Sequence, residues 1–385
     1  MTATSNPAMA PRHVMLVLGT RPEAIKMMPV LLALRARPGL RATLCATGQH
    51  RALLDQVLAA FDAGCDIDLG LMAPAQTPAD LTARILLALG PVLAAARPDL
   101  VLVHGDTTTA LAAALAAFHA GIPVGHVEAG LRSQDLTQPF PEEFHRVAVD
   151  ALARLRFAPT AAAAANLRAE YNRQAHILVT GNTGIDALLG MAARLSSDAA
   201  FRARETAALP PIPAGARLIL VTTHRRENLG EGLVRIAAGL AALAARPDVA
   251  LVVPLHPNPA VGPVLARLLD GHANIHLVPP LTYPQMVHLM GAATLLVTDS
   301  GGLQEEGPAL GKPVLVLREV TERPEALATG LLRLVGTDPA ALLAEASRLL
   351  DDPALYGRLA RPAFPYGDGR AAERIVDAIE GWGAA

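Results

Sequence analysis

Carboxylates follow several apolar runs of this sequence, at the points where a strand would end. Asp106 stands in LVLVHGDTTT, Glu128 in IPVGHVEAGLRS and Glu142 in PFPEEFHR. Several carboxylates directed at one crevice can remove a proton and return it. Each also has a structural explanation, because acids at helix N-termini are stabilising and Glu142 could pair with Arg146 one helical turn later.

Two segments that would join a strand to a helix suit an anionic ligand. GTRPEAIK offers Arg21 and Lys26 in place of a Gly-rich loop. A guanidinium together with a helix start can grip a diphosphate. The alternative is a capped helix, with Pro22 at its first position and two surface charges.

The second such segment, TDSGGLQEEG, follows another apolar run. Ser300, Gly301 and Gly302 would leave the backbone N–H groups of a helix start open to phosphate. Glu306, in the first turns, could reach a pair of ribose hydroxyls. The structural alternative is a serine that caps the helix.

The segment THRREN suggests a histidine beside the phosphates. His224 could protonate a departing phosphate or donate a hydrogen bond to it, and the alternative is a solvated charged turn. The sequence has no HExxH, no CxxC and no dense cluster of Asp and His, so no metal is expected. It also lacks G-x-G-x-x-G, so we expect no NAD.

Composition narrows the class of protein. The chain has 385 residues, a formal net charge of -2 and two cysteines. No block of like charge suggests nucleic acid as a partner, and two cysteines imply no disulfide framework. The first dozen residues do not read as a signal peptide, and the apolar run 85–96 is short for a membrane span. We therefore expect a soluble, cytoplasmic protein with no membrane partner.

Short β-branched runs alternate with longer Ala/Leu/Arg segments, which is typical of parallel sheets with helices on both faces. The runs form two series, so we expect an α/β protein of two doubly wound, Rossmann-like domains, joined near 180–215 where LPPIPAG looks like a linker. Ligands of such sheets bind beyond the carboxyl ends of the strands, where the polar residues stand. The predicted strands are 13–18, 42–47, 100–104, 123–127, 156–158, 176–181, 217–223, 250–256, 274–278, 293–300 and 313–317.

Eight segments in register resemble the non-hydrolysing UDP-N-acetylglucosamine 2-epimerases: GTRPEAIKMMPV, TGQHR, VLVHGDTTT, GIPVGHVEAGLRS, PFPEEFHR, THRREN, DSGGLQEEGPALGKPVLVL and TERPEA. The resemblance implies a GT-B-type fold, with two domains facing a central cleft. Residues 1–180 and a returning C-terminal helix in 367–385 would form one domain, and 181–366 the UDP-binding domain. It also implies a homodimer and interconversion of UDP-GlcNAc and UDP-ManNAc through 2-acetamidoglucal. This reaction needs no cofactor and would supply ManNAc units for cell-surface polysaccharide.

Roles follow from the resemblance, motif by motif. The catalytic groups would be Asp106, Glu128, Glu142 and His224. The resemblance does not indicate which carboxylate is the base. The UDP-sugar would be held by Arg21, Lys26, Ser300, Gly301, Gly302, Glu306 and Arg323. A second UDP-GlcNAc that activates the enzyme would be held by Gln49, His50 and His256.

The sequence departs from the family pattern at two places. His145 stands where Asn is usual, and Met286 stands where many members carry an aromatic residue near the uracil. The alternatives are a same-family 2-epimerase of another UDP-acetamido sugar, a hydrolysing epimerase that releases UDP and ManNAc, a GT-B glycosyltransferase, and a non-catalytic sugar-nucleotide sensor. The last two would have no use for the full set of carboxylates.

Overall fold

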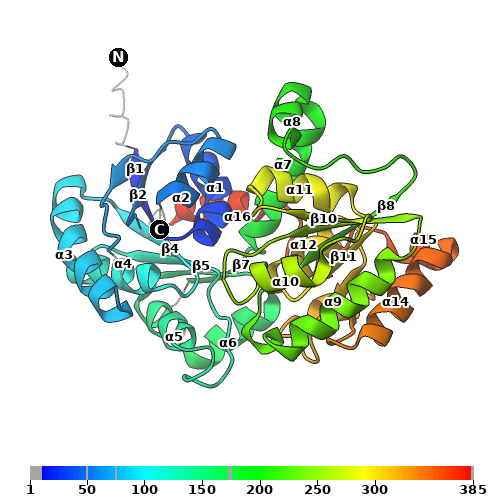
Figure 1. Ribbon diagram of the computed structural model, residues 1–385. Helices are drawn as coiled ribbons and strands as arrows, with labels where there is room; N and C mark the ends of the chain where they lie inside the picture. Colours follow the sequence, from blue (N-terminus) through cyan, green and yellow to red (C-terminus); the bar gives the residue numbers. More distant parts are fainter. Residues whose placement is uncertain (1–10, 49–50, 74–75, 172–175, 383–385) are drawn as a thin grey trace, which may run out of the picture. The chain divides into compact units, whose positions relative to one another are not determined.

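The structure is a computed structural model that describes residues 11–48, 51–73, 76–171 and 176–382. The chain divides into two compact units (Figure 1). Unit 1 comprises Met1–Ala187 and Gly367–Ala385, and unit 2 comprises Leu188–Tyr366. The segment 209–215, expected as a linker, lies inside unit 2, where it leads from a helix to the first strand of that unit.

Unit 1 holds a parallel sheet of seven strands in the order β3-β2-β1-β4-β5-β6-β7. The direction of strand addition reverses between β1 and β4, so this is the switch point at which doubly wound sheets bind ligands. The strands are β1 (Arg12–Leu18), β2 (Leu40–Ala46), β3 (Ile67–Asp68), β4 (Leu100–His104), β5 (Val124–Val127), β6 (Leu155–Ala158) and β7 (His176–Val179). The helices are α1 (Arg21–Arg35), α2 (Arg51–Ala60), α3 (Pro78–Ala96), α4 (Thr108–His119), α5 (Glu142–Leu152), α6 (Ala161–Glu170) and α16 (Ala371–Gly381), with α7 (Thr183–Ser197) at the boundary of the units.

Strand β1 is buried on both faces, and its side chains alternate between two cores. Val14 and Leu16 pack in a cluster with residues of α1, α2 and α16. Met15 and Val17 pack in a second cluster with residues of α3 and α4. A period of two along a strand with apolar residues at every position places helices on both faces of the sheet.

Unit 2 repeats the design with a parallel sheet of six strands in the order β10-β9-β8-β11-β12-β13. Its switch point lies between β8 and β11. The strands are β8 (Arg217–Thr222), β9 (Val249–Pro254), β10 (Ile275–Val278), β11 (Leu295–Thr298), β12 (Val314–Val316) and β13 (Leu332–Leu334). The helical elements are α8 (Ala199–Thr206), η1 (Arg226–Asn228), α9 (Glu231–Ala244), α10 (Gly262–Leu269), α11 (Tyr283–Ala292), α12 (Gly301–Ala309), α13 (Pro324–Ala328), α14 (Pro339–Asp351) and α15 (Pro353–Leu359).

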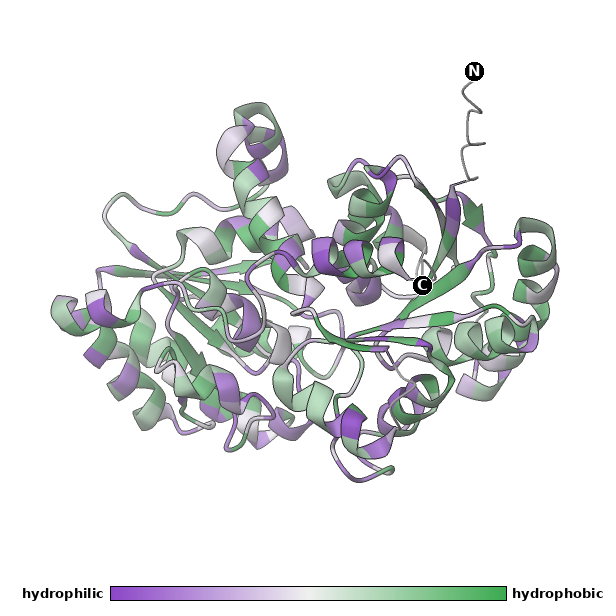
Figure 2. Ribbon diagram, turned by 180° about the vertical axis from the view of Figure 1, so that it is seen from behind, coloured by the Kyte–Doolittle hydropathy of each residue, from purple (hydrophilic) through white to green (hydrophobic). Residues whose placement is uncertain are grey.

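Helices also cover both faces of the second sheet. One core joins strand residues such as Ile219 and Val221 to α9, α10 and α14. On the other face α12 lies so close that a methyl group at Gly307 would be 2.5 Å from Val314 and 3.0 Å from Leu296. Figure 2 shows the strands of each sheet as largely hydrophobic, as burial on two faces requires.

The two-sheet α/β class predicted from the sequence is confirmed, and each predicted strand matches a strand within two residues at either end. Strands β3 and β13 are missing from the prediction because they have only two and three residues. One described helix, α3, is long and apolar enough by composition to cross a membrane. Its residues Leu81, Ile85, Leu89 and Leu93 pack in the core of unit 1.

Candidate active site

Asp106 and Glu128 lie at the ends of two neighbouring strands of unit 1. Strands β4 and β5 pair in parallel with His104 opposite Val127, and Gly105 N donates to Val127 O over 2.9 Å. A methyl group added at Gly105 would lie 3.6 Å from Glu128 Oε1. The two predicted carboxylates therefore end adjacent strands, as the sequence argument requires.

Glu128 has an unusual backbone conformation, and its side chain contacts Lys26 and His104. Its φ is +68°, in the left-handed region that a residue with a side chain rarely adopts. Lys26 from α1 forms an ion pair with its carboxylate, and His104 Nε2 lies 3.7 Å from the same oxygen. Burial lowers the pKa of His104 to about 3, against the opposing effect of Glu128, so this imidazole is neutral at neutral pH. Backbone strain that surrounding contacts maintain is typical of functional sites.

Asp106 is fixed by helix α5. Its carboxylate forms an ion pair with Arg146, and its carbonyl oxygen lies 2.9 Å from His145 Nδ1. Arg146 also approaches Glu143 at 3.1 Å. The pair between Glu142 and Arg146 considered from the sequence is replaced by these two contacts, because Asp106 and the buried Glu143 take the guanidinium. Glu142 itself is half-buried as the first residue of α5.

The turn after β1 brings Arg21 to the switch point of unit 1. Arg21 is the first residue of α1 and is half-buried. The buried carboxylate of Glu23 accepts from Gly19 N at 3.0 Å, from Thr20 N at 2.6 Å and from Thr107 Oγ1 at 2.6 Å. Glu23 thus joins this turn to the turn that carries Asp106. Sequence reasoning missed Glu23, although the Thr20–Glu23 spacing is that of a capping box.

In unit 2 the buried carboxylate of Asp299 organises the loop after β8. It accepts from Thr223 Oγ1 at 2.7 Å, from the backbone N–H groups of His224 and Arg225, and from Asn228 Nδ2 at 3.0 Å. Asp299 directly follows β11, the strand across the switch point from β8. The loop that carries His224 is therefore tied to the start of α12.

His224 stacks on His256, with ring centroids 5.4 Å apart and planes 15° apart. Its Nδ1 lies 3.4 Å from Asp299 Oδ1. Burial lowers the pKa of His224, and His256 and Arg225 act in the same direction, while Asp299 opposes them. A neutral imidazole here can donate a hydrogen bond to a phosphate oxygen. His256, expected at an activator site, is thus in contact with a predicted catalytic group, whereas Gln49 and His50 lie outside the described residues.

The N-terminus of α12 collects positive charge. A methyl group at Gly301 would lie 3.5 Å from a guanidinium nitrogen of Arg225 and 3.6 Å from one of Arg323. Ser300 is the N-cap residue, and its side chain makes no capping hydrogen bond. A helix N-terminus flanked by two guanidinium groups is suited to a phosphate. Arg225 was not singled out from the sequence, and its place beside His224 in THRREN was the available signal.

The remaining predicted grip residues lie in the same part of unit 2. Gly302 is exposed in the first turn of α12, and Glu306 is half-buried further along the same helix. Arg323 forms an ion pair with Glu305 of that helix. The structure therefore places Gly302 and Glu306 on α12, with Arg323 ion-paired to that helix.

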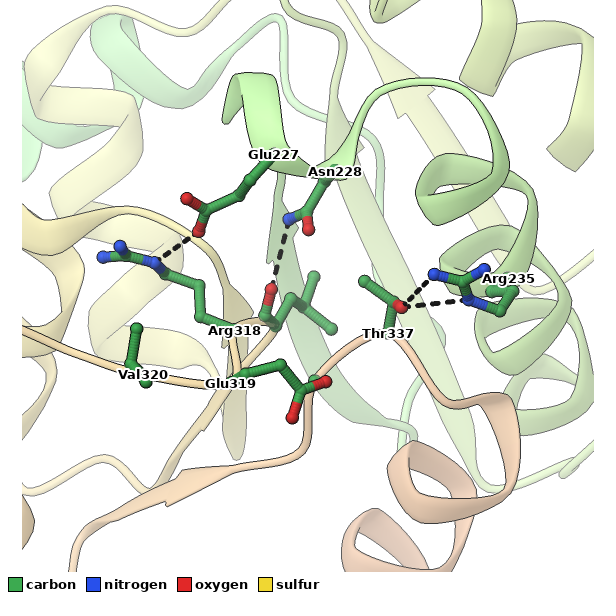
Figure 3. A pocket seen from close by; sticks show the side chains of 9 residues that line it. Glu227, Asn228, Arg235, Arg318, Glu319, Val320 and Thr337 are labelled. Carbon is green, nitrogen blue, oxygen red and sulfur yellow. Dashed lines mark hydrogen bonds and ion pairs between the residues drawn. The ribbon is translucent and has the colours of Figure 1, made fainter.

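A cavity of about 330 Å³ opens beside the same loop (Figure 3). Its lining includes Glu227 and Asn228 but not His224 or Arg225. Figure 3 shows Arg318 paired with Glu227, and Asn228 directed at the Leu317 carbonyl. The remaining lining residues are Arg235, Glu319, Val320, Gly336 and Thr337. Among the residues that the structure describes, no group of three or more His, Cys, Asp or Glu side chains could hold a metal ion.

Comparison with known proteins assigns the family. The sequence profile described as UDP-N-acetylglucosamine 2-epimerase matches residues 32–380. A probable UDP-N-acetylglucosamine 2-epimerase of Ralstonia solanacearum is 50% identical over 373 residues, which cover 96% of this chain and 99% of that protein. The UDP-N-acetylglucosamine 2-epimerase of Salmonella typhimurium is 48% identical over 96% of this chain and 98% of its own length.

Solved structures agree. The UDP-GlcNAc 2-epimerase of Neisseria meningitidis bound to UDP-GlcNAc is 44% identical, with a TM-score of 0.88 over 96% of this chain and 99% of that one. The S. aureus MnaA–UDP co-structure is 41% identical, with a TM-score of 0.82 over 96% of each chain. By sequence and by fold, this chain belongs to the UDP-N-acetylglucosamine 2-epimerase family.

Proposed function

We propose that this protein is a cytoplasmic, non-hydrolysing 2-epimerase that interconverts UDP-GlcNAc and UDP-ManNAc, with a role in supplying ManNAc for cell-surface polysaccharide. The observation that carries the proposal is the placement of Asp106 and Glu128 directly after the neighbouring strands β4 and β5, with Lys26 paired to Glu128. Adjacent carboxylates can exchange a proton with carbon, and the nearby cation offsets their charge. The names of the relatives at 48–50% identity support the substrate.

The chemistry we propose is elimination followed by re-addition. The hydrogen on C2 of the sugar is not next to a carbonyl, so its removal needs a leaving group on C1. A carboxylate takes this proton while the bond from C1 to the UDP oxygen breaks, which forms 2-acetamidoglucal and UDP. UDP then adds back to C1 as a proton is delivered to the opposite face of C2. Asp106, Glu128 and Glu142 share the two proton transfers.

The residues of unit 2 suit the leaving group. The N-terminus of α12, with Arg225 and Arg323 beside it, would bind the diphosphate before and after the C1–O bond breaks. His224 would donate a hydrogen bond to a phosphate oxygen, and Glu306 would bind the ribose. Fixed positive charge at a departing anion stabilises the transition state, because the charge develops there. In unit 1, Arg21 adds a further cation that suits an anionic substrate.

The decisive experiment is incubation with UDP-GlcNAc in heavy water, followed by NMR. The expected products are UDP-ManNAc and UDP-GlcNAc that carry deuterium at C2 with the UDP linkage intact. Release of free ManNAc would replace this proposal with a hydrolysing epimerase. Absence of exchange at C2 would point to another UDP-acetamido sugar or to transfer to an acceptor.

We propose that the protein acts as a homodimer through an exposed apolar face of α3. Leu87 on this helix is 78% exposed, and Phe118 at the end of the neighbouring α4 is 57% exposed. Exposed apolar side chains on two neighbouring helices suit burial against a second copy of the chain about a two-fold axis. Leu87→Glu should convert dimer to monomer in light scattering, while Val234→Glu, at an exposed position of α9 in unit 2, should leave it a dimer. A monomeric wild-type protein or a dimeric Leu87→Glu variant would contradict this interface.

Activation by a second UDP-GlcNAc remains part of the proposal. His256, which the resemblance assigns to such a site, stacks on His224. Binding of UDP-GlcNAc near His256 would therefore alter the contacts of His224, a proposed catalytic group. The expected result is a sigmoidal dependence of the epimerisation rate on UDP-GlcNAc, which becomes hyperbolic in His256→Ala.

A further inference from the structure

A buried carboxylate outside the proposed reaction lies on the same helix as Glu142. Asp150 of α5 is fully buried. Its Oδ1 is 2.6 Å from His126 Nδ1, and its Oδ2 accepts from Gly130 N at 3.1 Å and from Arg132 at 2.8 Å. Burial opposes ionisation, but His126 and Arg132 hold the pKa of Asp150 below its usual range. An ionised group with three donors is a rigid anchor.

His126 carries this anchor to the turn that bears Asp106. The imidazole lies on β5 and is fully buried. Its second nitrogen, Nε2, is 2.9 Å from the carbonyl oxygen of Gly105. Both partners are acceptors, so each ring nitrogen is directed at an oxygen, and the ring cannot turn over without losing these contacts.

The contact lies close in the chain to both proposed catalytic carboxylates, Asp106 and Glu128. Gly105 immediately precedes Asp106 and has a φ of +63°. His126 lies on β5, two residues before Glu128, which directly follows that strand. The next carbonyl, that of Asp106, faces His145 Nδ1 at 2.9 Å. Two consecutive carbonyl groups of this turn therefore each face a histidine.

We propose that His126, oriented by Asp150, is a positioning residue that holds the Gly105 carbonyl and thereby fixes Asp106 relative to Glu128. This inference rests on the proposed function, and His126 itself touches no substrate. The competing explanation is a buried ion pair that only stabilises unit 1. The two explanations differ in which contact of the imidazole matters.

Two amide variants separate the contacts. The side-chain nitrogen of Asn occupies roughly the place of Nδ1 and that of Gln roughly the place of Nε2. His126→Asn therefore keeps the contact with Asp150 and loses Gly105, and His126→Gln does the reverse. We expect kcat to fall about 10- to 100-fold in His126→Asn with KM within about 3-fold, because small misplacement of reacting groups has effects of this size. His126→Gln should restore most of the lost kcat, and His119→Asn, at an exposed histidine of α4, is the matched control.

A second readout does not depend on activity. Hydrogen–deuterium exchange of the segment 104–110 should be faster in His126→Asn than in wild type, and close to wild type in His126→Gln. If His126→Asn does not fold, Asp150→Asn serves instead, and we expect the same fall in kcat and the same faster exchange. Equal kcat values for the folded Asn and Gln variants, or unchanged exchange in the variant that loses the contact, would overturn the positioning role. Failure of wild type to epimerise UDP-GlcNAc would remove the proposed function, while the exchange result still decides whether His126 holds the turn.

Discussion

Replacement of Asp299 by Asn tests whether this carboxylate organises the His224 loop. Asp299 is fully buried and accepts from four donors: Thr223 Oγ1, His224 N, Arg225 N and Asn228 Nδ2. Asn keeps the size of the side chain but removes the charge and turns one acceptor oxygen into a donor. The new side-chain NH₂ group would face other hydrogen-bond donors at a buried position, where water cannot replace the lost acceptor.

The size of the effect follows from the contacts. Hydrogen bonds to a charged acceptor contribute about 1 kcal/mol more than neutral ones, so loss of charge over four donors costs about 4 kcal/mol. For a unit of the size of 188–366, this corresponds to a fall in Tm of about 8–16 °C. The affinity for UDP should fall as well, because the same contacts place Arg225 beside Gly301.

The assay pairs thermal unfolding with calorimetric UDP binding, and Asp270→Asn on the surface of the same unit controls for the change in net charge. Asp270 is exposed at the end of α10. A Tm of Asp299→Asn within about 2 °C of that of Asp270→Asn would refute the argument that Asp299 holds the loop, since the calculation in terms of four charged hydrogen bonds predicts several times that shift.

Further predictions address the other contacts. Arg225→Gln should weaken UDP binding about 10- to 100-fold in calorimetry, because one guanidinium leaves the start of α12, whereas Arg226→Gln at the exposed neighbour should not; equal effects would exclude the assigned role. Gly19→Ala should lower the free energy of unfolding by about 2–3 kcal/mol in urea, since its methyl group would lie 2.1 Å from Thr109 Oγ1, while Gly64→Ala, with nothing within 4 Å, should be near neutral. His104 is neutral when folded, with a pKa of about 3. Because unfolding restores its ordinary pKa, the unfolded chain binds the extra proton, and stability should fall by about 1 kcal/mol per pH unit as pH drops below about 6.5. His104→Gln should reduce that slope in urea titrations at pH 5 and 7.5, and an unchanged slope would rule out a buried neutral histidine.

Much of the fold could be predicted because the apolar pattern is strong. Strands buried on both faces give continuous apolar runs such as that of β1, and these runs locate the strand ends where polar residues begin. The short strands β3 and β13 escaped prediction because two or three residues carry no usable period. The site could be predicted only in part. The sequence shows which residues follow a strand, but it does not show which side chains contact them.

The contacts that position the site show the difference. Arg146 is four residues from Glu142, yet it pairs with Asp106, forty residues away. Helix α5 packs near the end of β4, and that packing, which no local spacing reveals, decides the pair. Arg225 and Asp299 were missed for the same reason, because their importance comes from contacts with segments distant in the chain.

The sequence by itself determined the alternation of strands and helices, the polar residues at the strand ends and the family resemblance, because these depend on side chains that are neighbours along the chain. Only the tertiary structure decided which strand ends are adjacent. The orders β1-β4-β5 and β8-β11-β12 make the strand ends before Asp106 and Glu128 neighbours and join the His224 loop to Asp299. Strand order is set by how helices cover both faces of each sheet, so it depends on packing over long sequence separations that the local pattern does not encode.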